Sequence, residues 1–253
     1  MSDTRVSVCM ATWNGEAYVR EQLDSILAEL EPQDEVVIVD DASSDRTVAV
    51  IEAVNDPRIR LHARKTNLGY VRTFEEALGH ATGDVMMLSD QDDVWIEGRR
   101  ALLVAATAAR AVAASNLVLL GESGSDAGPL RSPLTGKAWK LRTIDGPRRA
   151  RNQRRILIGD APYFGCAMAI RRDFLTVATP FPVYLTESHD LWIATLANAC
   201  GELAHVEQPS VRRRLHGANA SSERPRGLVQ ALRSRVLLLR LWGEACRRAR
   251  RWS

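Results

Sequence analysis

The stretch MMLSDQDDVW, residues 86–95, joins a short apolar run directly to three aspartates. Its first four residues are apolar or small and have the composition of the end of a buried strand. Asp90, Asp92 and Asp93 follow at once, and carboxylates this close repel one another unless a positive group lies among them. The stretch therefore predicts a buried strand that ends at a site for a cation.

The same pattern of an apolar run, a polar turn and a helical period occurs earlier in the chain. The run at 6–12 ends at Trp13-Asn14-Gly15, and the run EVVIV at 35–39 ends at Asp40-Asp41. Strands that alternate with helices of this size predict an α/β fold, a Rossmann-like, mostly parallel sheet with helices on both faces. The expected strands are 6–12, 35–39, 58–62 and 84–89, and the expected helices follow residues 15, 45, 70 and 95.

Ligands of such sheets bind where the strands end at their carboxyl side. The first, second and fourth expected strands place five carboxylates along this rim, those of Asp40, Asp41, Asp90, Asp92 and Asp93. Oxygen ligands packed this tightly suit Mg²⁺ or Mn²⁺, which keeps coordination positions for water and substrate phosphates. An alternative for one of them, Asp93, is that it caps a helix that starts near residue 96.

Length and composition indicate an ordinary globular protein. The chain has 253 residues, 45% hydrophobic and 26% charged, which suits one large α/β domain. We expect a cytoplasmic protein, because no export signal is visible at the N-terminus. The run 101–120 contains Arg110 and is too polar for a membrane span, so we expect a helix and then a strand there. Four scattered cysteines without a CxxC pair are expected to be buried small side chains.

The second half of the chain has a weaker pattern. We expect a loop at 121–133, a basic loop at 137–155 with eight Lys or Arg, and either strands or a strand plus a loop within 155–171. A helix is expected at 188–200 and one or two short strands at 203–214. Residues 226–253 predict a basic amphipathic helix, and residues 224–253 have nine Arg and one Glu. Residues 224–253 therefore have a net charge of +8. Since the whole chain has a formal net charge of +3, residues 1–223 have a net charge of −5.

Four stretches together resemble a known family. MATWNGEAYVREQLDSIL, VIVDDASSDRT, NLGYVRTFEEAL and MMLSDQDDVW have the order and spacing of the inverting family 2 glycosyltransferases, which have the GT-A fold. The DQDDVW form is most similar to bacterial rhamnosyltransferase-type members that build O-antigen, capsule or related glycans. The resemblance covers residues 5–100 and returns at 163–220. Ala42 stands where glycine is usual in the acidic motif.

The resemblance implies roles for residues on the rim. Thr12 and Asn14 would border the nucleotide pocket, and Asp41 would hydrogen-bond the base. In the DxD motif, Asp90 would meet the ribose and Asp92 would bind the metal. A metal at this position neutralises the charge that develops on a departing nucleoside diphosphate.

Two later segments complete the implied site. TESHDLWIA, at 186–194, resembles the motif of the general base and implies that role for Asp190, with His189 where many members have an acid and Glu187 nearby. In an inverting transfer this carboxylate removes a proton from the acceptor hydroxyl. RRRLHGANAS, at 212–221, resembles the segment that completes the metal site and implies His216 as a metal ligand and Arg214 as a diphosphate contact.

The resemblance also implies the domain organisation and the reaction. Residues 1–225 would form one GT-A domain, with a nucleotide-sugar half at 1–120 and an acceptor half at 121–225, followed by the helix at 226–253. The QxxRW motif of processive synthases is absent, which favours transfer of one sugar. The donor would be dTDP-rhamnose or a UDP-sugar, and the acceptor a glycan or a lipid-linked saccharide.

Alternatives remain at three points. The segment DQDDV also fits the DxDx[TV] nucleophile loop of haloacid dehalogenase-type phosphatases, and the fold also suits a protein that binds sugar nucleotides without catalysis. The basic tail suits nucleic acid, a solvated helix face or anionic lipid. We expect peripheral contact with the inner face of the cell membrane and no nucleic-acid partner.

Overall fold

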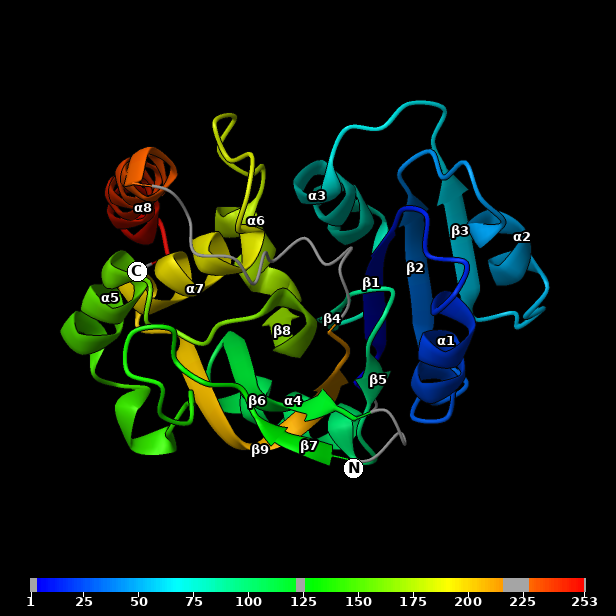
Figure 1. Cartoon of the computed structure of the whole chain (residues 1–253), viewed down its shortest axis with the longest axis horizontal. Helices are drawn as coiled ribbons and strands as arrows, with labels where there is room; N and C mark the ends of the chain where they lie inside the picture. Colours follow the sequence, from blue (N-terminus) through cyan, green and yellow to red (C-terminus); the bar gives the residue numbers. More distant parts are fainter. Residues whose placement is uncertain (1–3, 122–125, 216–227, 253) are drawn as a thin grey trace.

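The computed structural model describes residues 4–121, 126–215 and 228–252, and in 228–231 the backbone alone. Within these ranges the strands form one nine-stranded sheet with helices packed on both faces (Figure 1). The strand order is β3-β2-β1-β4-β8-β6-β9-β5, and β7 pairs with β6 at the side of this path. The predicted α/β fold is confirmed.

The first half is a parallel sheet with the predicted elements. Each of the first four strands lies within one residue of its expected bounds: β1 (Val6–Thr12), β2 (Glu35–Asp40), β3 (Ile59–Ala63) and β4 (Val85–Ser89). The helices between them are α1 (Val19–Leu27), α2 (Thr47–Glu52) and α3 (Tyr70–His80). β1, β2 and β4 are buried on both faces, which explains their nearly continuous apolar sequence.

In the second half the sheet becomes mixed. β4 pairs antiparallel with β8 (Met168–Arg171), which pairs antiparallel with β6 (Val112–Leu120). β9 (Leu203–Arg213) lies parallel to β6, and β5 (Val94–Trp95) closes the order antiparallel to β9. One sheet therefore continues from the first half of the chain into the second, across residue 120.

Several expectations for the second half were wrong. The expected loop at 121–133 contains the strand β7 (Asp126–Pro129), and the expected basic loop at 137–155 contains a 3-10 turn, η1 (Thr143–Asp145), and part of helix α5 (Arg149–Ile158). Within 155–171, where strands or a strand plus a loop were expected, the strand is β8 and a loop follows the end of α5, which was not expected. α5 escaped the pattern because two of its three buried side chains, Asn152 and Gln153, are polar, so its apolar period is weak.

The remaining helices divide between the two faces of the sheet. They are α4 (Arg99–Ala109), α6 (Leu175–Ala178) and α7 (His189–Cys200), with the 3-10 turns η2 (Gly165–Ala167) and η3 (Arg172–Phe174). One core contains side chains of α3, α6 and α7, and a second core on the other face contains side chains of α1, α2 and α4.

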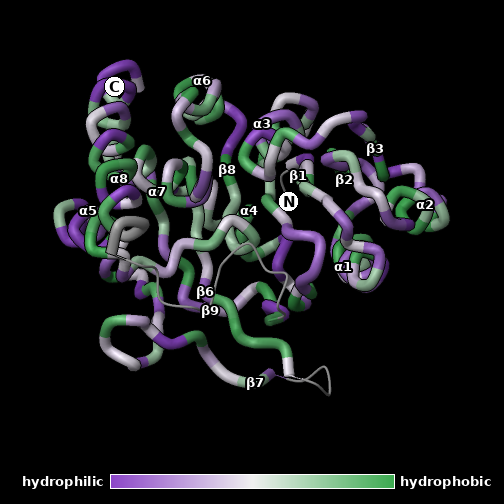
Figure 2. Tube along the Cα trace, turned by 45° about the horizontal axis from the view of Figure 1, so that its top comes forward, coloured by the Kyte–Doolittle hydropathy of each residue, from purple (hydrophilic) through white to green (hydrophobic). Residues whose placement is uncertain are grey.

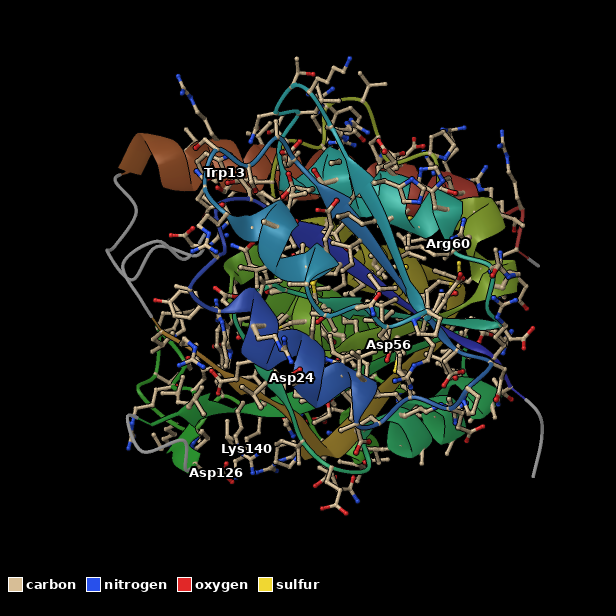
Figure 3. All side chains as sticks on the ribbon, turned by 90° about the vertical axis from the view of Figure 1, so that its right-hand side faces the viewer. Trp13, Asp24, Asp56, Arg60, Asp126 and Lys140 are labelled. Carbon is tan, nitrogen blue, oxygen red and sulfur yellow. The ribbon has the colours of Figure 1, made fainter. Side chains whose placement is uncertain are left out.

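The carboxyl ends of the parallel strands share one edge of the sheet. Figure 3 shows Trp13, just after β1, and Arg60, near the start of β3, toward opposite edges of the sheet. Because β1, β2 and β4 run in the same direction, the polar residues after them gather on the Trp13 side.

Helix α8 (Leu228–Ala249) packs against the domain through one face. Leu238, Leu241 and Ala245 join the core that contains α7. The expected C-terminal helix is therefore present, and its inner face contributes to the fold. In the described ranges we find no helix that is long and apolar enough to cross a bilayer.

We expect Leu241→Ala to lower the free energy of unfolding by about 2–5 kcal/mol, because it leaves a cavity in a well-packed core. Leu239, two residues earlier, is 52% exposed, so Leu239→Ala should change stability by no more than about 0.5 kcal/mol. Urea titrations of both variants measure the difference. Equal stabilities would show that α8 does not pack on the domain as described.

Candidate active site

The three aspartates after β4 form a crowded cluster. One ligand atom each from Asp90, Asp93 and Cys166 lie within 4.8 Å of one another. Burial and repulsion from Asp93 and Asp92 raise the pKa of Asp90 well above its usual range. Burial and the charge of Asp92 raise the pKa of Asp93 to about 6. The expected concentration of negative charge at this edge is therefore present.

Asp93 is not a helix cap, contrary to the alternative considered from the sequence. Residues 94–95 form β5 instead, and α4 begins only at Arg99 after Gly98. The Asp93 Oδ1 atom accepts a hydrogen bond from the backbone N–H of Arg214, at 3.1 Å. The short strand thus fastens the aspartate loop to the end of β9.

The carboxylates of this cluster fit a hard divalent cation. The buried Oδ2 atom of Asp93 has no hydrogen-bond partner among the described residues, and a cation would relieve the crowding that raises the pKa of Asp90. Cys166 does not fit Mg²⁺ or Mn²⁺, because burial raises the pKa of its thiol and a protonated thiol is a poor ligand. The metal roles of Asp92 and His216 stay predictions, and His216 lies outside the described residues.

A positive group faces this cluster from β9. Arg213 is buried and its guanidinium lies 5.0 Å from the centre of the Phe164 ring. Burial lowers its pKa, but the charges of the cluster, Asp90, Asp92 and Asp93 included, outweigh burial and raise it. Sequence reasoning selected the neighbouring Arg214 and missed Arg213. The alternation of a strand could have separated Arg213 from Arg212, which is more exposed, and Arg214 lies just beyond the end of β9.

Arg214 is engaged elsewhere in this structure. Its Nη2 donates to Glu21 Oε2 at 2.6 Å, and its Nε donates to the backbone oxygen of Asp92 at 3.2 Å. The guanidinium also lies 5.1 Å from the ring centre of Tyr18. Arg214 therefore joins α1 to the aspartate loop, and its contact with a diphosphate stays a prediction.

A second buried arginine lies beneath the cluster. Arg99 donates from Nη1 to Ser210 Oγ at 2.6 Å and from Nη2 to the backbone oxygen of Cys166 at 2.7 Å. Ser210 Oγ is also 2.6 Å from Ser115 Oγ. Burial lowers the pKa of Arg99 to about 10, so it remains protonated at neutral pH. Its positive charge was not anticipated from the sequence, where it reads as a surface residue of a helix.

The middle residue of the DQD segment joins the aspartate loop to the end of β1. Gln91 accepts a hydrogen bond from the backbone N–H of Trp13 at 2.8 Å and donates to the backbone oxygen of Trp13 at 3.1 Å. A Cβ atom at Gly15 would lie 2.3 Å from Gln91 Oε1. Glycine at 15 therefore leaves the room that the Gln91 side chain occupies.

The residues expected to border the nucleotide are linked to the loop after β2. Thr12 Oγ1 donates to Asp40 Oδ2 at 2.9 Å. Asn14 Oδ1 accepts from the backbone N–H of Ser44 at 2.8 Å. Ala42, in the place where glycine is usual, has a φ of 63°, which costs a residue with a Cβ roughly 1–2 kcal/mol. Hydrogen bonds thus hold this part of the rim together.

Asp41 orders the turn that follows β3. Its carboxylate accepts hydrogen bonds from the backbone N–H groups of Leu68 and Gly69, each at 2.8 Å, and from Arg64 Nη1 at 2.9 Å. The buried pair with Arg64 fixes its orientation. The structure therefore gives Asp41 a structural task, and its hydrogen bond to a base stays a prediction.

The expected base, Asp190, lies in the first turn of α7. Its Oδ1 accepts the backbone N–H of Leu191 at 2.8 Å. Burial raises the pKa of Asp190 to about 6, while backbone hydrogen bonds and the charge of Arg213 oppose the rise. The charge of Asp190 also adds to the rise in the pKa of Asp90. The structure thus brings the ends of β4, β9 and α7 together around Arg213.

Two aromatic side chains lie near Asp190, and of these Tyr70 was missed from the sequence. Tyr70, at the start of α3, accepts the backbone N–H of Ser188 on its hydroxyl at 2.9 Å. Burial and the charges of Asp190, Glu187 and Asp90 raise the Tyr70 pKa to about 12, so the phenol stays neutral. His189 stacks on Phe74 with ring centres 4.3 Å apart.

The two residues whose roles the sequence left open have different surroundings. Burial lowers the pKa of His189 to about 3, and neither of its ring nitrogens has a hydrogen-bond partner in the described part of the chain. His189 is therefore a neutral side chain next to Asp190 in sequence, and it does not supply the charge of the acid that many family members have at this position. Glu187 accepts a hydrogen bond from Ser234 Oγ of α8 at 3.0 Å, which links the base motif to α8.

Comparison with known proteins decides the family. A model described as Glycosyl transferase family 2 matches residues 7–177. The chain belongs to glycosyl transferase family 2. Membership in this family contradicts the phosphatase alternative. It does not test the rhamnosyltransferase-like subtype that the resemblance suggested.

Curated relatives of this family 2 chain match only part of it. A putative glycosyltransferase, EpsE, of Bacillus subtilis is 35% identical over 96 residues, which is 37% of this chain and 34% of that protein. An Escherichia coli protein named UDP-Glc:alpha-D-GlcNAc-diphosphoundecaprenol beta-1,3-glucosyltransferase WfgD is 30% identical over 99 residues, 39% of each chain. The matched segments thus span little more than a third of these relatives.

Solved structures confirm the GT-A fold. TarS 1-349 of S. aureus in complex with UDP-GlcNAc superposes with a TM-score of 0.67 at 18% identity, over 96% of this chain and 72% of that one. The complex of the same protein with UDP gives 0.65 at 19% identity, over 93% and 65%.

Proposed function

We propose that this chain is an inverting glycosyltransferase that moves one sugar from a nucleoside diphosphate sugar to a hydroxyl group of an acceptor. The observation that carries the proposal is the mutual electrostatic influence of Asp90, Asp190 and Arg213: the charge of Asp190 adds to the rise in the pKa of Asp90, and the charge of Arg213 opposes the rise in both. A transfer with inversion needs a charged donor site and a base on the opposite side of the sugar. Residues of β4 and α7 supply these two parts.

Asp190 acts as the general base in this proposal. With a pKa near 6 its carboxylate is ionised at neutral pH and still basic enough to accept a proton as the acceptor oxygen attacks. The backbone N–H of Leu191 holds one carboxylate oxygen, at 2.8 Å, and thereby orients the group. The neutral rings of Tyr70 and His189 contact each other on the α3 side, with ring centres 5.7 Å apart.

Asp90, Asp92 and His216 would hold Mg²⁺ or Mn²⁺ with the donor. The buried Oδ2 atom of Asp93, which has no hydrogen-bond partner among the described residues, supports a cation in this region. When bound, such a cation supplies Lewis-acid stabilisation of the negative charge on the departing diphosphate. Arg213 adds a fixed positive charge that does not depend on the cation. Thr12, Asn14 and Asp41 would contact the nucleoside, and Arg214 would reach the diphosphate after leaving Glu21.

The donor and acceptor follow from the relatives. TarS is named as a complex with UDP and with UDP-GlcNAc, and the E. coli relative is named for UDP-Glc and a diphosphoundecaprenol acceptor. A UDP-sugar is therefore the first candidate donor, and dTDP-rhamnose the second because of the DQDDVW form. We propose a glycan or lipid-linked acceptor in cell-surface polysaccharide synthesis, and action at the cytoplasmic face of the membrane.

We expect one nucleotide class among UDP-glucose, UDP-GlcNAc and dTDP-rhamnose to bind and to be hydrolysed slowly in the presence of Mn²⁺, because water replaces a missing acceptor. Release of nucleoside diphosphate measures the reaction, and the Asp190→Asn variant is the matched control. Binding without turnover of any donor, even with saccharide acceptors, would favour the non-catalytic sugar-nucleotide-binding alternative. Failure to bind any nucleotide sugar would refute both.

A further inference from the structure

Helix α8 has a second, exposed apolar stripe beside the face that packs on the domain. Leu232, Val236 and Leu239 are 66%, 50% and 52% exposed, and Trp242 and Cys246 continue the same side of the helix. We call these five residues the outer stripe. Their spacing of three and four residues places them on one face, next to the inner face that packs on the core. Contiguous exposed apolar surface of this kind marks an interaction site.

Arginines flank the outer stripe. Residues 228–252 contain seven arginines and one acid, Glu244. Arg233, Arg240 and Arg247 are spaced seven residues apart and therefore form one row beside the stripe. Glu244 pairs with Arg247 and Arg248, so it leaves the rest of the row uncompensated. Figure 2 shows hydrophobic and hydrophilic segments alternating along α8.

A loop of the domain extends this surface toward the base motif. Val183, in the segment between α6 and α7, is 91% exposed. Its neighbour Tyr184 donates from its hydroxyl to the backbone oxygen of Arg240 at 3.3 Å, and the Arg240 guanidinium lies 4.0 Å from the Tyr184 ring centre. Figure 1 shows this loop beside α8. Val183 is therefore adjacent in sequence to a residue that contacts the row of arginines, and it lies seven residues before Asp190.

A cavity opens beside the same helix. It has a volume of about 450 Å³ and is bordered by Trp242, Cys246 and Arg250 of α8 and by Arg149 of α5. An indole and arginines at the mouth of a cavity suit a molecule with an apolar part and an anionic head. This combination is typical of a phospholipid at the membrane interface.

We propose that the outer stripe, the arginine row and Val183 form a docking surface for an anionic lipid bilayer, with α8 parallel to the membrane plane. An apolar stripe beside a row of cations is the pattern of helices that lie in the interface of anionic membranes. A second copy of the chain fits less well, because two such faces would bring like charges together. A nucleic acid would leave the apolar stripe in water.

This proposal rests on the proposed function, because the bilayer would be the partner that carries the acceptor. Val183 precedes the base motif closely, and Glu187 is bonded to Ser234 of α8. A bilayer under α8 would therefore place an acceptor carried on a lipid beside the segment that holds Asp190.

Sedimentation with vesicles tests the proposal on the full chain. We expect binding to vesicles of phosphatidylglycerol and phosphatidylcholine, and little binding to phosphatidylcholine alone. The triple variant Leu232→Gln, Val236→Gln, Leu239→Gln and the triple variant Arg233→Gln, Arg240→Gln, Arg247→Gln should each bind the anionic vesicles at least about tenfold more weakly. A matched control, Leu134→Gln with Ile144→Gln, changes exposed apolar residues elsewhere and should bind as the wild type does.

The variants should fold, because the inner face of α8 is unchanged. Circular dichroism verifies this. Equal binding by the wild type and the stripe variant overturns the proposal, as does the absence of any binding to anionic vesicles. If the stripe variant binds vesicles as the wild type does but no longer forms a dimer that the wild type forms in analytical ultracentrifugation, the face binds a second copy of the chain instead. Calorimetry of nucleotide-sugar binding needs no bilayer, so failure of the proposed function and failure of the docking surface give separate results.

Discussion

The Asp190→Asn variant is expected to transfer sugar about 10²–10⁴ times more slowly than the wild type, which is the usual effect of removing a positioned base. Asparagine keeps the shape of the side chain and its hydrogen bond from the N–H of Leu191, but it does not accept a proton at neutral pH. Donor affinity should stay nearly constant. Transfer assays paired with calorimetry of the donor separate these effects.

The pH dependence of the wild type provides a second measurement of the same group. Because the pKa of Asp190 is raised to about 6, its carboxylate is ionised above that pH and protonated below it. The rate should therefore fall as the pH drops through about 6, and the residual rate of Asp190→Asn should lack this fall. Glu187→Gln is the matched control and should keep most of the activity, since Glu187 is bonded to α8. Normal turnover by Asp190→Asn would place the base elsewhere, with Glu187 next.

The Asp92→Asn variant should lose donor binding and turnover together, with kcat/KM lower by at least about a hundredfold. The lost charge acts on the cation in the ground state as well as in the transition state, so both constants should change. Excess EDTA should have the same effect on the wild type, and Mn²⁺ or Mg²⁺ should reverse it. Calorimetry with Mn²⁺ and the donor measures the binding part.

Asp24 offers a matched control for the loss of a negative charge. It lies on α1, is paired with Arg20 and is exposed, so Asp24→Asn should bind donor as the wild type does (Figure 3). Full transfer in EDTA together with normal donor binding by Asp92→Asn would remove the metal from the mechanism. It would leave Arg213 as the charge that balances the aspartates.

The first half of the fold was predictable because its strands are buried on both faces. A run such as EVVIV has no competing interpretation when capping residues and a helical period follow it. The second half was not, because its pattern depends on partners far away in sequence. β7 consists of Asp126, Ala127, Gly128 and Pro129, residues that favour a loop, and it pairs with β6 through a register shift. Local propensity therefore gave the wrong prediction there.

The clustering of carboxylates was predictable where residues of one charge are concentrated in sequence. Asp90 and Asp92 stood out as carboxylates at the end of a strand, whereas Asp190 was selected through the resemblance of TESHDLWIA to the motif of the general base, and the roles of all three stay predictions. Cys166 and Arg99 were missed, since each comes to the cluster from an element that the sequence does not link to it. Asp93 was assigned wrongly because a two-residue strand, β5, is too short to leave a pattern.

The chain has three consecutive arginines at the end of β9, Arg212 and Arg213 in the strand and Arg214 directly after it, which make the charge beside the aspartates tolerant of small insertions and deletions. Arg213 points toward the aspartates, and shifting the strand by one position in either direction would present Arg212 or Arg214 in its place. β9 already pairs with β6 through irregular register upstream of this triplet. Lineages of this chain could therefore gain or lose a residue in β9 and still keep a guanidinium over the aspartate loop.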